Sequence, residues 1–338
     1  MTVSAILLIK LSSLGDVIHT LPALSDARRI WPELQIDWVV EEAFVPVAGW
    51  HPAVRTVIPI ALRRWRHHWR DLWREFPPFR AQLRAQTYDQ VIDAQGLLKS
   101  AIVAAQARGT RYGFDRHSSR ESLSHWFYQQ HIAVPKQAHA VERTRQLFAR
   151  ILGYACPTTP PDYGIAGHFE KQHAAHPTLI FLHGTTWSSK HWPIAHWQSL
   201  AQLAVDAGYH VQVAWGSALE QARASAIMAV HPHVSLIPRT DLAGMAQVML
   251  QAKAVVGVDT GLSHLAAALS VPSVTVYSAT APERTGTYGT KQVHLQAAFP
   301  CSPCLRRHCY YQGKYYTSPV CARDLSVERV WMAIEMLI

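Results

Sequence analysis

The sequence predicts an α/β protein of two domains, each built around a parallel β-sheet, and three observations lead to this prediction. Apolar runs of strand length alternate with amphipathic helical stretches along the chain, which is typical of right-handed βαβ units. The 338 residues are many for one domain and comfortable for two. The segment "CPTTPPDYGI" is rich in Pro and Thr, which indicates a linker. We therefore expect domains at 1–155 and 166–338, a linker at 156–165, and a cleft between the domains.

The individual elements follow from the apolar pattern. Predicted helices cover residues 97–108, 139–154, 195–207, 242–253 and 262–269. Predicted strands are 5–10, 35–42, 55–60 and 89–95 in the first domain, and 178–184, 210–216, 234–238, 254–259 and 273–278 in the second. In open parallel sheets, ligands bind at the carboxyl ends of the strands. The loops that follow strands are therefore where we expect functional residues.

Composition limits the class of protein. Hydrophobic residues make up 49% and charged residues 16% of the chain, so a large core is expected and wholesale disorder is not. The apolar runs are far shorter than the roughly 20 residues needed to span a bilayer, and the N-terminus lacks a signal-peptide layout. These features predict a soluble, cytoplasmic protein.

Positive charge is concentrated in the first half of the chain. The net charge is +9, and residues 1–165 hold 20 Lys and Arg against 14 Asp and Glu, while residues 166–338 hold 12 against 9. This asymmetry predicts an anionic partner for the first half: a nucleic acid, a membrane surface or a phosphorylated substrate. A basic but otherwise ordinary surface fits the charge equally well.

The segment "RRWRHHWRDLWR" repeats its Trp and Arg residues every four positions. On a helix this spacing gives one stripe of Trp65, Trp69 and Trp73 beside a stripe of arginines. We expect the Trp stripe to pack on the core and the arginines to face phosphates or anionic lipid. Stacking on nucleic acid is the rival interpretation, but the chain contains no nucleic-acid-binding motif.

The loop "KLSSLGD" carries a single carboxylate, Asp16, between a strand and a helix. Such a carboxylate can assist phosphate binding, act as a base or cap the helix, and the residues alone favour the cap. Gly15 is expected to give this loop a tight turn.

Two strand-end loops of the second domain suit a diphosphate. In "VVGVDTGLSH", Asp259, Thr260 and Gly261 precede a helix whose N-terminus can receive a phosphate; an ordinary capped helix is the alternative. In "FLHGTTWSSKHWP", hydroxyl side chains accompany Lys190, but the loop lacks P-loop spacing and also fits a solvated polar loop. Glu220 stands after the next strand, where it could accept hydrogen bonds from ribose hydroxyls. No D-x-D pair ends a strand, so the helix N-terminus and Lys190 are expected to stabilise the leaving group.

Four of the five cysteines form a cluster with the spacing C-x2-C-x4-C-x11-C. Four thiols in a short stretch of a cytosolic chain resemble a structural zinc site more than a disulfide framework, although the second pair is unusually far apart. The alternative is a set of free thiols. The cluster consists of Cys301, Cys304, Cys309 and Cys321.

Several motifs together resemble the lipopolysaccharide heptosyltransferases of glycosyltransferase family 9. The motifs are "KLSSLGDVIHTLPAL", "DWVVEE", "RRWR", "VIDAQGLLKSA", "HAVERTRQLFA", "KHWP" and "VDTGLSHLAAAL", and they extend over nearly the whole chain. "DTGLSHLAAAL" indicates the wider family. "DWVVEE", "RRWR" and "DAQGLLKSA" favour the enzyme that adds the first heptose over the one that adds the second.

The resemblance implies a GT-B fold, two Rossmann-like domains facing each other across a cleft. It implies an inverting transfer of L-glycero-D-manno-heptose from ADP-heptose to the inner Kdo of Kdo2-lipid A, at the cytoplasmic face of the inner membrane. The N-terminal domain would bind the acceptor and the C-terminal domain ADP-heptose, with no cofactor or catalytic metal required and no nucleic acid as partner. The final helix could also pack back on the N-terminal domain.

The resemblance also implies roles for individual residues. Asp16 would be the catalytic base that takes the proton from the Kdo hydroxyl. The donor residues would be Thr185, Thr186, Lys190, Glu220, Asp259, Thr260, Gly261 and His264, and the acceptor residues Ser13, Gly15, Arg63, Arg64, Arg66, Gln95, Arg120 and His139. Two other functions remain open: another nucleotide-sugar transferase of this architecture, such as the enzyme that adds the second heptose, or a non-catalytic protein that binds membranes or nucleic acid.

Overall fold

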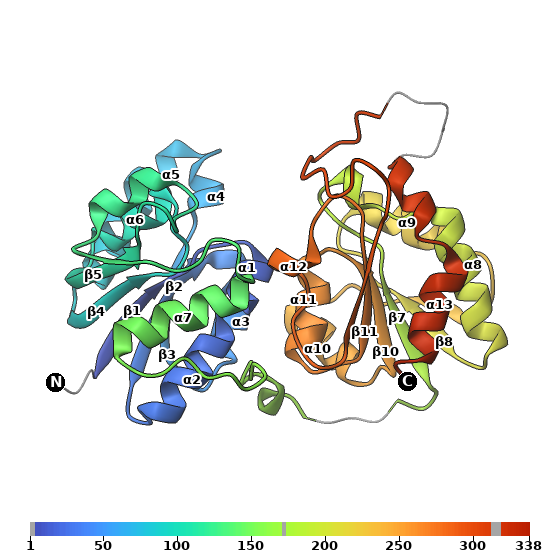
Figure 1. The fold of residues 1–338 in the computed structure, drawn as a ribbon, viewed down its shortest axis with the longest axis horizontal. Coiled ribbons are helices and arrows are strands. Elements are labelled where there is room, and N and C mark those ends of the chain that lie inside the picture. The colour runs from blue at the N-terminus through green and yellow to red at the C-terminus, as the bar shows by residue number, and fades with distance from the viewer. Residues whose placement is uncertain (1–3, 171–173, 312–318) are drawn as a thin grey trace. The chain divides into compact units, whose positions relative to one another are not determined.

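The computed structural model describes residues 4–170, 174–311 and 319–338. The chain divides into two compact units, Met1–His168 and Phe169–Ile338. Each unit contains a six-stranded sheet with helices against it (Figure 1). Among the described residues, no helix is long and apolar enough to cross a membrane.

The sheet of the first unit is parallel and has the order β3-β2-β1-β4-β5-β6. Its strands are β1 (Ala5–Ile9), β2 (Gln35–Glu41), β3 (Val54–Ile60), β4 (Thr87–Asp93), β5 (Arg108–Phe114) and β6 (Gln130–Ile132). Its helices are α1 (Leu14–Ile18), α2 (Leu21–Ile30), α3 (Val45–Gly49), α4 (Leu62–Trp65), α5 (Trp69–Leu83), α6 (Leu98–Ala104) and α7 (Ala140–Leu152), with short 3-10 turns η1 (Glu42–Phe44), η2 (Ser122–Phe127) and η3 (Ala166–His168).

The second unit repeats this topology with the order β12-β11-β10-β7-β8-β9, again parallel. Its strands are β7 (Thr178–Leu182), β8 (His210–Val213), β9 (Val234–Leu236), β10 (Ala254–Val258), β11 (Ser273–Tyr277) and β12 (Gln292–Gln296). Its helices are α8 (Ile194–Asp206), α9 (Ala218–Met228), α10 (Leu242–Leu250), α11 (Gly261–Ala268), α12 (Pro282–Thr285) and α13 (Val327–Glu335), with turns η4 (Ser188–Lys190) and η5 (Val320–Asp324).

Both sheets are doubly wound with the same switch in strand order. Numbered within its own unit, each sheet reads 3-2-1-4-5-6, so the direction of winding reverses between the first and fourth strands. Ligands of such folds bind outside the carboxyl ends of the strands at this switch. The switch lies between β1 and β4 in the first unit and between β7 and β10 in the second, and it selects the four loops where a site is expected.

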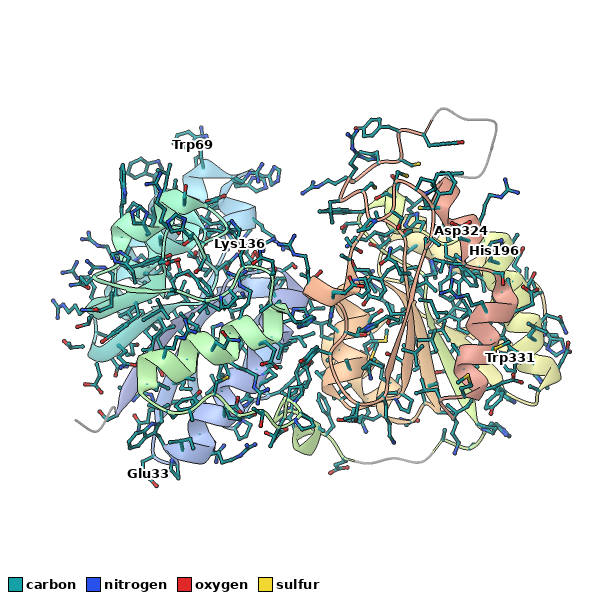
Figure 2. The ribbon with its side chains drawn as sticks, in the orientation of Figure 1. Glu33, Trp69, Lys136, His196, Asp324 and Trp331 are labelled. Carbon is teal, nitrogen blue, oxygen red and sulfur yellow. The ribbon has the colours of Figure 1, made fainter. Side chains whose placement is uncertain are left out.

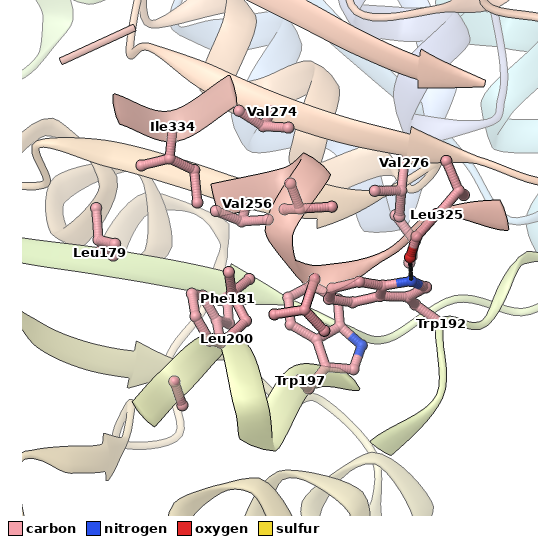
Figure 3. Close-up of a cluster of buried hydrophobic side chains, with 14 of the residues drawn as sticks. Leu179, Phe181, Trp192, Trp197, Leu200, Val256, Val274, Val276, Leu325 and Ile334 are labelled. Carbon is pink, nitrogen blue, oxygen red and sulfur yellow. Dashed lines mark hydrogen bonds between the residues drawn. The ribbon is translucent and has the colours of Figure 1, made fainter. Parts of the chain in front are cut away.

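Tryptophan packing anchors the end of the chain in the second unit. Trp192 and Trp197 meet edge to face with ring centroids 5.1 Å apart, and the indole N–H of Trp192 donates to the carbonyl of Leu325 at 2.9 Å (Figure 3). Following Leu325, α13 packs on α8 and β11 of its own unit. Whether it also reaches the first domain stays a prediction.

The fold class predicted from the sequence is confirmed, and all nine predicted strands form. The strands β5, β6 and β12 were not predicted. β6 and β12 are edge strands with polar residues, and β5 contains two arginines, so none shows a clear apolar run. The helix expected over 97–108 ends at Ala104, because β5 begins at Arg108.

The expected Trp stripe is wrong in its packing. The helix breaks after Trp65 and a new helix starts at Trp69, which changes the direction in which the later side chains point. Trp65 is buried, but Trp69 and Trp73 are 64% and 74% exposed. The core contacts of α5 come instead from Phe79 and Leu83.

Candidate active site

The loop after β1 places Asp16 in the first turn of α1. Ser13 caps this helix, and its backbone N–H donates to Oδ2 of Asp16 at 2.9 Å. The Ser13 hydroxyl donates to the same oxygen at 3.2 Å, so Asp16 stabilises the helix end as the acidic partner of a capping box. Its other oxygen, Oδ1, faces the guanidinium of Arg120 at 3.6 Å. Gly15 is a helical residue of α1, so the tight turn expected at this glycine is wrong; the helix has already begun at Leu14.

Gln95 follows β4 and was predicted to contact the acceptor; in the structure it stabilises the loop after β1. The Oε1 of Gln95 accepts from the N–H of Leu11 at 2.6 Å, and its Nε2 donates to the carbonyl of Ser12 at 3.0 Å. Gln95 is in turn fixed by Asp93, which accepts from its backbone N–H at 2.8 Å. Because β1 and β4 are neighbours at the switch point, the two strand ends hold Asp16 in place together.

Two cations set the charge of Asp16. Burial by itself would raise the pKa of this carboxyl, but Lys10, Arg120 and the hydrogen bonds from Ser13 outweigh burial and lower the pKa below its usual value. Lys10 is buried, and its ammonium donates to the carbonyl of Ala94 at 2.9 Å. Asp16 is therefore ionised at neutral pH while its side chain remains 25% exposed. A general base needs both charge and access.

The three arginines predicted to contact the acceptor differ in their surroundings. Arg64 already lies among carboxylates: its Nη2 is 2.8 Å from Oε2 of Glu75 and 3.2 Å from Oε2 of Glu42. Arg63 and Arg66 are exposed. The exposed positive charge of this segment consequently lies on Arg63 and Arg66. Arg64 is less available to contact an acceptor, because it already pairs with carboxylates.

His139, another predicted acceptor residue, caps a helix. Its Nδ1 accepts from the N–H of Val141 at 3.2 Å at the start of α7. Its ring meets the ring of His19 edge-on with centroids 5.3 Å apart. His139 is 9% exposed, and its role toward an acceptor stays a prediction.

In the second unit, a carboxylate again follows a strand at the switch point. Asp259 follows β10, and Lys190 comes from the loop after β7, with its Nζ 2.6 Å from Oδ2 of Asp259. The hydroxyl of Thr280 donates to the same oxygen at 2.6 Å, and Nε2 of His264 lies 3.6 Å from Oδ1. Burial would raise the pKa of Asp259, but His264 and Lys190 hold it far below its usual range. With 8% of its side chain exposed, Asp259 is a buried anchor for Lys190.

The threonines of the loop after β7 lie beside this anchor. The hydroxyl of Thr185 donates to the carbonyl of Asp259 at 3.5 Å, which joins the two strand-end loops. Thr186 is exposed. The ammonium of Lys190 also lies over the Trp187 ring, 4.6 Å from its centroid. The loop therefore presents a fixed cation beside hydroxyl groups, a combination that suits a diphosphate.

Glu220 approaches the same loop from α9. Its Oε2 accepts from the N–H groups of Gly216 and Ser217 at 2.9 and 3.1 Å. A Cβ on Gly184 would lie 2.5 Å from Oε1 of Glu220, so a larger residue at position 184 would force the Glu220 side chain to shift from its place beside the end of β7. Glu220 thus lies beside Gly184, in the loop that also carries Lys190, and its role toward ribose hydroxyls stays a prediction.

The N-terminus of α11 lies directly after Asp259. Thr260 is the N-cap and Gly261 the first helical residue. The hydroxyl of Ser263 donates to the carbonyl of Val258 at 2.7 Å, and a Cβ on Gly257 would lie 2.4 Å from that hydroxyl oxygen. The helix consequently packs closely on β10, with its N–H groups at the carboxyl end of the sheet.

The expected zinc site is not formed in the described part of the chain, where no group of three or more His, Cys, Asp or Glu side chains is arranged to hold a metal ion. Cys321 is buried in the core of the second unit, whereas Cys301 is exposed. None of the four cysteines forms a disulfide. Burial raises the pKa of Cys321 to about 12, and the nearby thiols add to this effect.

Two residues of these sites were missed in the sequence. Lys10 ends the strand pattern "AILLIK" and was given no role from the sequence, but its ammonium turns inward to the carbonyl of Ala94. Thr280 lies twenty-one residues after Asp259 and joins it only because β10 and β11 are neighbours in the sheet. The only signal was position: Lys10 is the last residue of a predicted strand, and Thr280 follows another predicted strand closely.

Two doubly wound units with charged strand ends at their switch points fit the class of nucleotide-sugar glycosyltransferases that are built from two Rossmann-like domains. The model of glycosyltransferase family 9 (heptosyltransferase) matches residues 78–315. Lipopolysaccharide heptosyltransferase 1 of Pseudomonas aeruginosa is 47% identical over 346 residues, which cover 98% of each chain. This chain belongs to glycosyltransferase family 9 and is an enzyme of that family.

Solved structures agree with this assignment. The Escherichia coli heptosyltransferase WaaC with ADP superimposes with a TM-score of 0.88 at 42% identity, covering 99% of this chain and 100% of that one. WaaC with ADP-2-deoxy-2-fluoro heptose gives 0.86 at 42% identity, covering 98% and 99%. By contrast, lipopolysaccharide heptosyltransferase 2 of E. coli is 25% identical over 298 residues, 83% of this chain and 84% of the relative.

Proposed function

We propose that this chain transfers L-glycero-D-manno-heptose from ADP-heptose to the inner Kdo of Kdo2-lipid A, with inversion, in the biosynthesis of the lipopolysaccharide inner core. The observation that carries this proposal is the 47% identity over nearly the full length to lipopolysaccharide heptosyltransferase 1, against 25% to heptosyltransferase 2. The solved complexes of WaaC with ADP and with a fluorinated ADP-heptose support ADP-heptose as the donor.

In this proposal, the first unit supplies the base. Asp16 accepts the proton of the Kdo hydroxyl on Oδ1, since its Oδ2 is committed to Ser13. The hydroxyl oxygen then attacks the anomeric carbon of the heptose from the face opposite ADP, so a single displacement inverts the configuration. Arg120 lies beside Oδ1 and is suited to meet an anionic group of the acceptor.

The second unit stabilises the leaving ADP. Its diphosphate would lie at the N-terminus of α11 next to Lys190, where the helix dipole and the ammonium oppose the charge that develops on the leaving oxygen. Asp259 holds that ammonium at 2.6 Å, so little reorganisation is needed when the diphosphate arrives. Because no D-x-D motif ends a strand, we propose that Lys190 and the helix fill this role without a catalytic metal or another cofactor.

We also propose the location of the enzyme, the cytoplasmic face of the inner membrane. The acceptor is a lipid, the donor is a nucleotide sugar, and the first half of the chain is basic. Arg63 and Arg66 would meet the negative groups of the acceptor. No nucleic acid is expected to bind.

A transfer assay tests the proposal. The purified protein is incubated with ADP-heptose and Kdo2-lipid A, and the product is analysed by mass spectrometry. We expect the addition of one heptose to the acceptor. If only an already heptosylated acceptor were extended, the chain would be the enzyme of the following step; if no acceptor were extended while ADP still bound, the donor assignment would stand and the acceptor assignment would be wrong.

A further inference from the structure

Helix α5 presents two large aromatic side chains to solvent. Trp69 and Trp73 are 64% and 74% exposed, and because they are four residues apart they lie on the same side of the helix. Figure 2 shows Trp69 pointing away from the ribbon of the first unit. A contiguous exposed apolar patch on a soluble protein marks a surface for interaction.

This exposure is fixed by the packing of the opposite side of the helix. Phe79 and Leu83 are buried in the core of the first unit. Phe76 meets the buried Trp65 edge to face with centroids 6.4 Å apart, and the indole N–H of Trp65 donates to Glu75 at 2.8 Å. Rotating α5 to bury Trp69 would break these contacts, so the indoles remain outside.

The charge around the two tryptophans is positive. Residues 63–84 contain seven arginines and two carboxylates. Both carboxylates are engaged by Arg64: Glu75 lies 2.8 Å and Asp71 3.3 Å from its guanidinium. Arg70 is exposed and lies over the Trp69 ring, 5.8 Å from its centroid. The outer surface of α5 thus combines indole rings with arginines, while its acidic groups are neutralised by partners.

We propose that α5 docks the enzyme on an anionic lipid bilayer, with Trp69 and Trp73 in the interfacial layer and Arg70 against headgroup phosphates. Indole rings favour the boundary between water and hydrocarbon, and basic amphipathic helices with aromatic residues lie in that boundary. Anionic headgroups attract nearby arginines. An anionic bilayer therefore offers both an interface for the two indole rings and phosphates for Arg70. The inference rests on the proposed function in one respect: docking would bring the enzyme to an acceptor lodged in the same membrane.

Vesicle binding without substrates tests the docking alone. The full chain is sedimented with vesicles of phosphatidylethanolamine and phosphatidylglycerol, and with vesicles of neutral phosphatidylcholine. We expect binding to the anionic vesicles that weakens as salt is added, and weak binding to the neutral ones. The double variant Trp69→Ser/Trp73→Ser should bind the anionic vesicles at least about tenfold more weakly, because two apolar side chains no longer leave water. Trp126→Ser, a matched control on η2 with a 75% exposed indole, should bind like the wild type.

Activity assays separate docking from catalysis. The double variant should transfer heptose to a deacylated, water-soluble Kdo acceptor at the wild-type rate, and about tenfold more slowly than wild type to Kdo2-lipid A embedded in anionic vesicles. Absence of transfer by the wild type on both acceptors would refute the proposed function, whereas vesicle binding would still report on α5. Equal losses on the two acceptors would assign the tryptophans to the substrate and overturn the docking proposal.

Three further results would overturn the proposal: no binding of the wild type to anionic vesicles, unchanged binding of the double variant, or an equal loss in Trp126→Ser. If the double variant altered the oligomeric state in size-exclusion chromatography while vesicle binding stayed the same, α5 would be a contact between copies of the chain. A melting temperature close to wild type in both variants verifies that they fold.

Discussion

The two units have the same sheet topology, and each carries a carboxylate at its switch point: Asp16 after the first strand of one sheet and Asp259 after the fourth strand of the other. The two carboxylates are held differently. Asp16 keeps one oxygen on Ser13 and turns the other toward an exposed arginine. Asp259 has Lys190 and Thr280 on one oxygen and His264 near the other, and it is nearly buried. The comparison teaches that a place at the switch point does not by itself fix the role of a carboxylate: Asp16 has an oxygen available for a proton, whereas both oxygens of Asp259 have partners and this residue positions a cation.

The largest expected effect comes from Asp16→Asn. The amide oxygen of Asn can still accept from Ser13, and the two residue types cap helices about equally well, so the melting temperature should stay close to wild type. The amide cannot take a proton, and general-base catalysis contributes about 10²–10⁴-fold. We expect normal binding of ADP-heptose and a transfer rate at least a hundredfold lower, measured by product mass spectrometry and by calorimetry with the donor.

A variant that retains most of its rate would place the base elsewhere and leave Asp16 with its helix-capping role alone. The pH profile gives a second check. Because the pKa of Asp16 is lowered, the base remains ionised to below the usual carboxyl range, and the acidic limb of the wild-type rate should fall there and not near neutrality.

The next effect is that of Lys190→Ala. The lost charge-assisted contact with a diphosphate is worth about 1.5–3 kcal/mol, so catalytic efficiency for ADP-heptose should fall tenfold or more. Acceptor KM should change little, since Lys190 lies in the second unit. Initial rates at limiting donor measure the loss. Unchanged efficiency would remove Lys190 from the donor site.

The surroundings of the two carboxylates could be predicted from the sequence only where the interactions are local in the chain. The strands β1, β4, β7 and β10 were predicted because each is an apolar run, and the loops after them could be marked as candidate sites. The strand order is set by pairing between distant segments, so the sequence did not show that Gln95 braces the loop of Asp16 or that Thr280 reaches Asp259. The different exposure of the two carboxylates depends on those same long-range contacts.

The prediction that the three tryptophans form one buried stripe was wrong for a related reason. Trp65, Trp69 and Trp73 have the spacing of a single helix, but the break between α4 and α5 divides them. The ion pairs of Arg64 with Glu42 and Glu75 hold the corner between these helices, and Glu42 lies in η1, well before both helices in sequence. A pattern within a twelve-residue window carried no information about that partner.

Stability in acid should separate the two carboxylates. The pKa of Asp259 is lowered in the folded state, so its stabilising effect is fully present above the unfolded value near 4 and is lost as the pH falls toward the folded value. Asp259→Asn removes one partner of a largely buried pair, which costs about 3 kcal/mol of unfolding free energy at neutral pH, and it should flatten the loss of stability in acid. The pKa of Asp16 is lowered as well, but this side chain is 25% exposed and Asn keeps the helix cap, so Asp16→Asn should cost less stability than Asp259→Asn. Urea unfolding between pH 3 and 7 measures both; equal losses would contradict the distinction between an anchor and an accessible base.

The smallest expected effects concern the arginines that precede α5, and they refine the comparison inside the first unit. Arg63→Ala/Arg66→Ala removes two exposed charges, each worth up to about 1 kcal/mol toward an anionic group, so acceptor KM should rise several-fold and depend less on salt. Affinity for ADP should stay the same, because the proposed donor residues belong to the second unit.

Arg64→Ala is the matched control for this double variant. The guanidinium of Arg64 is engaged by Glu42, Asp71 and Glu75, so Arg64→Ala should lower the melting temperature more than the double variant does. It should change the salt dependence of acceptor KM less. Kinetics at several salt concentrations and thermal melts measure both. A fall in ADP affinity with unchanged acceptor kinetics would mean that the donor and acceptor roles of the two units are reversed.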